Sequence, residues 1–308
     1  MIGESNIKAK RPSNKVISLT RKRLEKKIVP VQEKNRNIQS NTRVIAITSG
    51  KGGVGKTNIV ANLGFALSKL GNKVLLLDAD LALGNLDVLL GLAPRHNFLD
   101  VIMGSMTVPG ITVEGPANMK ILPASSGVQE LSQLTKGIKA RIFTGLDSLM
   151  HSIDILLIDT PSGISSNVIY FNKSAQEIIV VISPEPTSMT DAYALMKVLS
   201  LRYSKSDFKI LVNLAMNGDE ADGVFRKMKQ VTDRFLNVSI EYIGHILFDE
   251  NVIKSVKLQK LVTDIYPDSA GSRCFVALAN KIHITTPAYF SMGSNIPFWE
   301  QVLQNSLE

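Results

Sequence analysis

The sequence predicts an α/β protein in which a doubly wound, mostly parallel β-sheet is flanked by helices. Short apolar runs rich in β-branched residues alternate along the chain with longer helix-like stretches, which is the order that parallel sheets require. Each run is apolar at successive positions, as strands buried on both faces are. A glycine-rich loop joins the first run to the first helical stretch. The expected strands are 43–48, 73–78, 154–159, 177–182 and 208–213, and the expected helices are 57–70, 138–150, 187–203 and 222–235.

Charge divides the 308 residues unevenly. Residues 1–43 hold 12 of the 35 Lys and Arg residues but only 3 of the 27 Asp and Glu residues, so the net charge of +8 belongs to this end. The rest is close to neutral, which excludes a uniformly basic nucleic-acid-binding domain. We expect a basic, disordered and flexible tail over 1–42, a P-loop domain over 43–283, and a linker with an amphipathic helix over 284–308. For the tail, a solubilising arm, a contact with an anionic membrane and a contact with nucleic acid all stay open.

Hydropathy and cysteine content indicate the cellular compartment. No apolar run approaches the roughly 18 residues that a transmembrane helix needs. The first residues, MIGESNIKAK, lack the apolar stretch of a signal peptide. The one cysteine, Cys274, excludes an intramolecular disulfide framework. We therefore expect a cytoplasmic protein.

The segment SGKGGVGKT, residues 49–57, follows an expected strand and opens an expected helix. Glycines let backbone N–H groups turn toward phosphate oxygens, and the helix N-terminus adds a favourable dipole. In this GxxxxGKT pattern, Lys56 is expected to reach the β- and γ-phosphates of a nucleotide, and Thr57 to offer its hydroxyl to Mg²⁺. The expected nucleotide-binding residues here are Gly50, Lys51, Gly52, Gly53, Val54, Gly55, Lys56, Thr57 and Asn58.

Carboxylates stand at the ends of two expected strands. Asp78 and Asp80 are two residues apart, and strand alternation aims both toward the same side. Asp159 ends the apolar run ILLID, which is typical of a Walker B aspartate that holds Mg²⁺ through water. Because ligands of open α/β sheets bind at the carboxyl ends of strands, we expect these side chains to face the phosphate-binding loop.

The octapeptide GKGGVGKT carries a second lysine, Lys51. On this motif the chain resembles the MinD/ParA class of P-loop ATPases with a deviant Walker A motif, over about residues 43–283. The resemblance implies a MinD-like P-loop fold and a homodimer that buries two ATP molecules, in which Lys51 reaches phosphates bound by the other copy. It also implies that Asp80 orients the attacking water and that Asp78 belongs to the Mg²⁺ shell. The implied catalytic residues are Lys51, Lys56 and Asp80, and the metal residues are Thr57, Asp78 and Asp159.

The same resemblance gives roles to residues outside the loop. Matching asparagines in the family hydrogen-bond the adenine edge, and Asn213 ends the last expected strand. The segment GHILFDENV, residues 244–252, resembles a loop that lines the base and makes Asp249 a base contact. Leu247 stands there where the family usually has proline. The expected switch residues are Asn85, Thr160, Pro161 and Gly163.

The stretch SPEPTSMTDAYALMKVL, residues 183–199, is most similar to the flagellar-number ATPases called FlhG, FleN or YlxH. As local structure it is a strand end followed by a helix with Thr187 or Ser188 as N-cap. The resemblance implies a slow, regulatory ATPase that acts as a dimerisation switch. It would control flagellar number or placement through a flagellar transcription activator or an FlhF-type GTPase. The DQAxxLR element by which many members stimulate that GTPase is absent from residues 1–43.

Members of this class end in an amphipathic helix that targets the membrane, and an apolar face follows Pro297 here. Such a face suits interfacial insertion. The charges nearby are Glu300 and Glu308, which anionic lipid does not attract. A peripheral contact at the inner face of the cell membrane and docking onto the protein's own surface both stay open. The apolar face consists of Phe298, Trp299, Val302, Leu303 and Leu307.

Two other functions stay open. One is a MinD-like division-site or ParA-like DNA-partitioning ATPase; the near-neutral domain disfavours DNA coating, so nucleic acid is not expected on the core. The other is a nucleotide-bound scaffold without turnover, which the presence of Asp80 and Asp159 disfavours.

Overall fold

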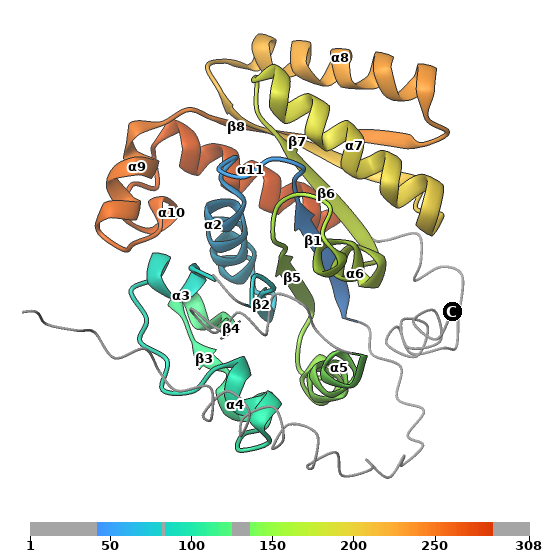
Figure 1. Cartoon of the computed structure of the whole chain (residues 1–308). Helices are drawn as coiled ribbons and strands as arrows, with labels where there is room; N and C mark the ends of the chain where they lie inside the picture. The colour runs from blue at the N-terminus through green and yellow to red at the C-terminus, as the bar shows by residue number, and fades with distance from the viewer. Residues whose placement is uncertain (1–41, 82–83, 125–135, 286–308) are drawn as a thin grey trace, which may run out of the picture. The chain divides into compact units, whose positions relative to one another are not determined.

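A computed structural model of the chain describes residues 42–81, 84–124 and 136–285. Contacts divide the chain into Met1–Asn37 and Ile38–Glu308, and all described residues belong to the second unit. They form an eight-stranded sheet with helices on both faces (Figure 1), so the expected doubly wound α/β fold is confirmed. The expectations for residues 1–41 and for the C-terminal apolar face lie outside the described residues.

Five of the eight observed strands agree closely with the expected apolar runs, and β3, β4 and β8 were not expected. They are β1 (Arg43–Thr48), β2 (Val74–Asp78), β3 (Val113–Glu114), β4 (Lys120–Leu122), β5 (Ile155–Asp159), β6 (Glu177–Ile182), β7 (Asp207–Ala215) and β8 (Ser239–Leu247). Their order is β3-β4-β2-β5-β1-β6-β7-β8, which places β1 in the middle of the sheet. Neighbouring strands pair in parallel, except that β3 and β4 pair antiparallel at one edge.

Helices join the strands. They are α2 (Lys56–Lys69), α3 (Leu86–Leu89), α4 (Phe98–Met103), α5 (Lys136–Met150), α6 (Ser166–Ser174), α7 (Pro186–Tyr203), α8 (Gly218–Phe235), α9 (Glu250–Lys257), α10 (Val262–Ile265) and α11 (Ala270–Ile284). Two short 3₁₀ turns, η1 (Pro109–Ile111) and η2 (Pro116–Asn118), complete the irregular region before α5. Among the described helices, none combines the length and apolar character needed to cross a bilayer.

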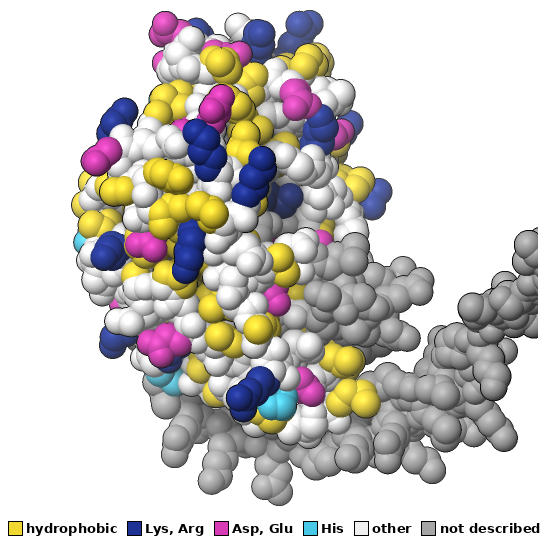
Figure 2. All heavy atoms as spheres, turned by 90° about the vertical axis from the view of Figure 1, so that its left-hand side faces the viewer, with side chains coloured by type: hydrophobic (Ala, Val, Ile, Leu, Met, Phe, Trp, Pro, Cys, Tyr) yellow, Lys and Arg dark blue, Asp and Glu magenta, His cyan; other side chains and the backbone are white. Residues whose placement is uncertain are grey.

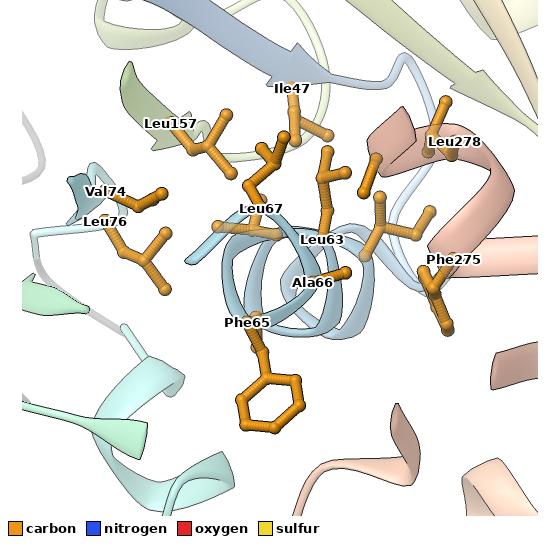
Figure 3. Close-up of a cluster of buried hydrophobic side chains, with 14 of the residues drawn as sticks. Ile47, Leu63, Phe65, Ala66, Leu67, Val74, Leu76, Leu157, Phe275 and Leu278 are labelled. Carbon is orange, nitrogen blue, oxygen red and sulfur yellow. The ribbon is translucent and has the colours of Figure 1, made fainter. Parts of the chain in front are cut away.

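Helix α2 forms the centre of the core on one face of the sheet. Figure 3 shows its Leu63 and Leu67 pointing at Ile47 of β1 and Leu157 of β5, while Leu278 of α11 closes the other side. Because α2 is covered by the sheet and by α11 together, every position from Ile59 to Leu67 is buried. This packing fixes the start of α2, and with it the loop that precedes it. Helices α6, α7 and α8 cover the opposite face (Figure 1).

Three helix and loop expectations need correction. Helix α8 begins at Gly218 rather than 222, because the Asn217 side chain accepts a hydrogen bond from the Glu220 N–H and caps it there. Helix α7 begins at Pro186 without a side-chain cap. The Ser188 hydroxyl instead accepts from the Ser183 N–H, 3.0 Å away. The segment 244–252 is no continuous loop, since its first residues end β8 and its last begin α9.

A buried charge cluster ties the amino ends of the strands together. Arg43 at the start of β1 is paired with Glu177 of β6, with Nη2 and Oε2 2.8 Å apart. Lys209 of β7 reaches the same carboxylate at 2.6 Å. The Arg43 guanidinium also donates to the carbonyls of Ile282 and Thr285, the latter at 3.0 Å, and so holds the end of α11. This cluster lies at the opposite end of the strands from the glycine-rich loop.

The described surface carries interspersed charges. On the face drawn in Figure 2, Lys and Arg side chains alternate with Asp and Glu and with hydrophobic side chains. Along the exposed helices this mixing produces local ion pairs, such as Lys229 with Asp233 and Lys254 with Glu250. The pattern agrees with the near-neutral charge expected for the domain.

Candidate functional site

The glycine-rich loop lies at the carboxyl end of the central strand β1 and leads into α2. Gly50 packs against the backbone of α7: a Cβ there would lie 2.1 Å from the Asp191 carbonyl carbon. Gly55 has φ +90°, in the left-handed region that favours glycine. Gly53 is left-handed as well, with φ +78°. The loop therefore needs these glycines for conformation and for close approach, as its sequence predicts.

Lys56 opens α2 and is buried at the base of the loop. Its Nζ donates to the Ser49 hydroxyl at 2.9 Å, and that hydroxyl donates to the Lys51 carbonyl at 2.6 Å. Burial lowers the pKa of Lys56, and the carboxylates of Asp159 and Asp80 oppose that effect. The result is a cation held under the loop, where phosphates of a nucleotide would need it.

The second lysine has a partner within the same chain. Lys51 Nζ forms an ion pair with Glu185, which precedes α7. The pair is accessible, with side-chain exposures of 34% for Lys51 and 58% for Glu185. An accessible ion pair contributes little to stability and exchanges partners readily. Lys51 is therefore available to a stronger anion at this surface.

Two carboxylates come together beside the loop. Asp78 of β2 and Asp159 of β5 are register partners on adjacent strands. Asp78 is buried and accepts from the N–H groups of Leu86 (3.1 Å) and Asp80 (3.2 Å). Burial and the neighbouring charge of Asp159 hold the pKa of Asp78 well above its usual range. Burial also raises the pKa of Asp159 to about 6, against a hydrogen bond from Thr57 and the charge of Lys56.

The residues present fit a divalent cation. Oδ1 of Asp159 is buried and has no hydrogen-bond partner, which is costly unless a ligand satisfies it. The Thr57 hydroxyl lies next to Asp159 and forms a hydrogen bond with its side chain. Hard oxygen ligands of this kind suit Mg²⁺. In the described ranges no three His, Cys, Asp or Glu side chains group as a metal centre, so phosphate oxygens and water would complete the shell.

The expected switch residues flank this site. Asn85 stands just before α3, whose first N–H, that of Leu86, is held by Asp78. After β5, the Thr160 hydroxyl donates to the Ile47 carbonyl at 3.1 Å, and the Gly163 N–H donates to the Ser49 carbonyl at 3.0 Å. Both segments are thus tied to the strands that carry the carboxylates or the loop. Pro161 lies between Thr160 and Gly163 in the segment after β5. Asp80 follows β2 and is partly buried.

The two expected base contacts differ in their surroundings. Asn213 is buried and its amide Nδ2 donates to the Val54 carbonyl of the loop at 2.7 Å. Asp249 caps α9 and uses both oxygens, accepting from Asn251 N–H at 2.8 Å and from Gly271 N–H at 2.9 Å. These backbone hydrogen bonds lower the pKa of Asp249 despite partial desolvation. Asn213 therefore lies at the loop, while Asp249 is committed to the starts of α9 and α11.

Two residues of the site were not identified as such from the sequence. Ser49 links both lysines, and the only sequence signal was its place at the start of the motif. Glu185 lies in the segment 183–199, which resembles the flagellar-number ATPases, but the resemblance gives this residue no role in the site. Its contact with Lys51 depends on the position of α7, which a local pattern does not reveal.

Comparisons with known proteins agree with this geometry. Residues 42–212 match a family described as an AAA domain. The antiactivator FleN of Pseudomonas aeruginosa is 43% identical over 240 residues, which cover 78% of this chain and 86% of FleN. The flagellum site-determining protein YlxH of Helicobacter pylori is 30% identical over 245 residues, which cover 79% of this chain and 83% of YlxH.

Solved structures show the same relationship. The cell division ATPase MinD of Pyrococcus furiosus superposes with a TM-score of 0.65 at 27% identity, covering 78% of this chain and 98% of that chain. MinD of Pyrococcus horikoshii, complexed with Mg-ADP, gives a TM-score of 0.65 at 25% identity, covering 79% and 96%. The chain therefore belongs to the MinD/ParA family of P-loop ATPases, in the group that contains FleN and YlxH.

Proposed function

We propose that this protein is an ATP-hydrolysing dimerisation switch that regulates the number or placement of flagella. The observation that carries the proposal is the convergence of two lysines and three aspartates at the carboxyl ends of the inner strands β1, β2 and β5. Lys51 and Lys56 belong to the loop after β1, while Asp78, Asp80 and Asp159 end or follow β2 and β5. Positioning and electrostatic stabilisation are what phosphoryl transfer to water requires.

Each residue has a separate task in this proposal. Lys56 binds the phosphates from below the loop, where Ser49 holds it. Asp80 orients the attacking water and accepts its proton. Thr57 and Asp159 would hold Mg²⁺, supported by the unpartnered Asp159 oxygen, and the ion would neutralise phosphate charge. Asp78 holds α3 in place through the Leu86 N–H.

Dimerisation would give Lys51 a new partner. In the single chain its ammonium is paired with Glu185 on the surface. A triphosphate bound by a second copy carries more negative charge than one carboxylate and would attract the lysine more strongly. ATP would thereby join two copies, and hydrolysis with loss of phosphate would separate them.

The relatives support a flagellar role. FleN is named an antiactivator and YlxH a flagellum site-determining protein. By analogy, the ATP-bound dimer of this protein would restrain a flagellar transcription activator, or act on an FlhF-type GTPase, in the cytoplasm or peripherally at the membrane. Septum site-determining proteins named MinD, which are 36–40% identical to this chain, keep division-site selection as the second candidate.

Two substitutions test the switch. Asp80→Ala is expected to dimerise with ATP, because the loop and Lys51 remain, but to hydrolyse ATP poorly. Lys51→Ala is expected to stay monomeric with ATP and with little turnover. Light scattering and phosphate release measure both properties. Equal dimerisation of both variants without ATP would refute the mechanism, and turnover by neither wild type nor variants would favour the scaffold reading.

The biological role needs a different measurement. The Asp80→Ala protein, held in the ATP state, would serve as bait in cells of its source. Recovery of a flagellar regulator or basal-body protein is the expected result. Recovery of septum or chromosome-partitioning proteins in its place would favour the MinD-like or ParA-like alternative.

A further inference from the structure

Asn213 contacts the phosphate-binding loop directly. Its amide Nδ2 donates to the Val54 carbonyl at 2.7 Å, and both residues are buried, at 5% and 3% exposure. Asn213 belongs to β7, and β6 separates that strand from β1, whose end starts the loop. The hydrogen bond therefore ties the loop to a strand two positions away in the sheet.

The chemistry of the contact fixes the orientation of the amide. A carbonyl oxygen only accepts hydrogen bonds, so the Asn213 nitrogen must face Val54. A Cβ placed on Gly55 would lie 2.5 Å from Nδ2 and 3.8 Å from Cγ, with the amide oxygen beyond 4 Å. The nitrogen thus faces the loop and the oxygen faces away from it. The close contact also explains why glycine follows Val54.

The backbone of β7 is distorted next to this side chain. Leu214 has φ +63°, a left-handed conformation that is unfavourable for a residue with a Cβ. The pairing of β7 with β8 shifts register between Asn213 and Ala215. The Phe248 N–H holds the far side of the shift by donating to the Ala215 carbonyl at 2.8 Å. Bulges of this kind redirect side chains and are frequent beside functional sites.

We propose that Asn213 is a positioning residue for the phosphate-binding loop, which holds the Val54 carbonyl so that the neighbouring N–H groups stay turned toward the phosphates. The inference rests on the proposed ATP site. The positioning role of Asn213 is separate from any contact with the base, and it does not require the ligand to have a base. The affinity for a ligand that consists only of phosphates must therefore fall when the Asn213 amide is removed.

Inorganic tripolyphosphate with Mg²⁺ is the probe, compared with Mg-ATP by titration calorimetry on the full chain. Asn213→Ala is expected to weaken tripolyphosphate binding about threefold to tenfold, the effect of one lost buried hydrogen bond. Asn62→Ala is the matched control. Asn62 is a buried asparagine of α2 whose oxygen accepts from the Thr263 hydroxyl at 2.9 Å and whose nitrogen donates to the Asn58 carbonyl of the same helix at 2.9 Å. We expect this control to leave tripolyphosphate affinity unchanged.

Hydrogen exchange of the nucleotide-free chain tests the tether without a ligand. Amides of residues 51–55 are expected to exchange faster in Asn213→Ala and in Asn213→Asp than in the wild type or in Asn62→Ala. The aspartate variant keeps the size of the side chain but offers Val54 no donor, so it replaces the alanine variant where that one does not fold.

The outcomes separate the two hypotheses. Unchanged tripolyphosphate affinity with weaker ATP binding would overturn the inference and leave Asn213 as a base contact only. Unchanged exchange of the loop amides in both variants would overturn it as well. A wild type that binds neither ligand would refute the proposed ATP site, while faster exchange in the variants would still support the tether itself.

Discussion

Replacing Asp159 by asparagine is expected to stabilise the nucleotide-free protein. The Asp159 carboxylate is buried, and its Oδ1 has no hydrogen-bond partner. Burial raises its pKa from 3.8 to about 6 even with the Thr57 hydrogen bond and the Lys56 charge in place. That difference corresponds to about 3 kcal/mol in the free energy of unfolding. Asparagine has the same shape without the charge, so it removes most of this cost.

Neighbouring groups adjust the magnitude in opposite directions. Removing the Asp159 charge relieves Asp78, whose pKa is raised by burial and by Asp159. It also removes a charge that favours the ammonium of Lys56. We therefore expect a net gain of roughly 2–3 kcal/mol at pH 7.5, measured by urea unfolding with EDTA and without nucleotide.

The pH dependence supplies a second signature of the Asp159→Asn change. A raised carboxyl pKa makes the folded state bind more protons than the unfolded state between pH 3.8 and about 6. Wild-type stability therefore falls relative to the variant as the pH rises through this window, and the difference is constant above it. The gain at pH 5 must be smaller than the gain at pH 7.5.

The exposed pair of Asp233 with Lys229 provides the control. Asp233→Asn is expected to change stability by less than about 0.5 kcal/mol. The Asp159→Asn variant is expected at the same time to lose the stabilisation that Mg-ATP gives the wild type. A variant that is less stable than wild type in EDTA, or a gain that is the same at both pH values, would refute the reasoning.

Three further predictions concern other parts of the chain. Glu177→Gln leaves Arg43 buried without its counter-charge and should cost about 3–5 kcal/mol in urea unfolding at pH 7. The Arg43 and Lys209 partners lower the pKa of Glu177, so its contribution is present above pH 4.5 and lost as pH falls through the lowered pKa; the variant should lack this loss. Gly50→Ala should lower the melting temperature by several degrees because the new Cβ meets the backbone of α7, whereas Gly137→Ala, with no atom within 4 Å, should not. Glu185→Gln should strengthen ATP-dependent dimerisation in sedimentation, since Lys51 loses a competing partner, whereas Glu250→Gln on α9 should leave it unchanged.

The parts of the fold that could be predicted from sequence are those with local signals. Strands β1, β2, β5 and β6 are apolar at nearly every position, and each was located within one residue of its bounds. Strand β8 was missed because its SIEYIGHIL mixes exposed polar and buried apolar residues, with a glycine inside. The sequence places the start of α8 too late, at residue 222, because its first turn is polar and contains glycine, although Asn217 is an ordinary N-cap residue.

The same distinction holds for the site. The spacing of residues along the chain was sufficient to predict the phosphate-binding loop from Gly50 to Thr57, because phosphate binding there uses consecutive backbone groups. It was also sufficient for Asp78 and Asp159, since parallel strands bring their carboxyl ends to one edge. The partners of Lys51 and Asn213 could not be predicted this way. Each contact joins residues more than 130 positions apart through the packing of α7 and β7.

These unpredicted contacts hold the loop and the segment after β5 in place. The loop is held from one side by Asn213 through Val54 and from the other by α7, against which Gly50 packs. The segment after β5 is attached through the Gly163 N–H to the backbone carbonyl of Ser49, whereas Lys56 donates to the side-chain hydroxyl of the same residue. A phosphate that draws Lys56 away from the hydroxyl therefore leaves the hydrogen bond of Gly163 in place. Ser49→Ala removes the contact with Lys56 but keeps the carbonyl, so the Gly163 amide should keep its protection from hydrogen exchange in this variant.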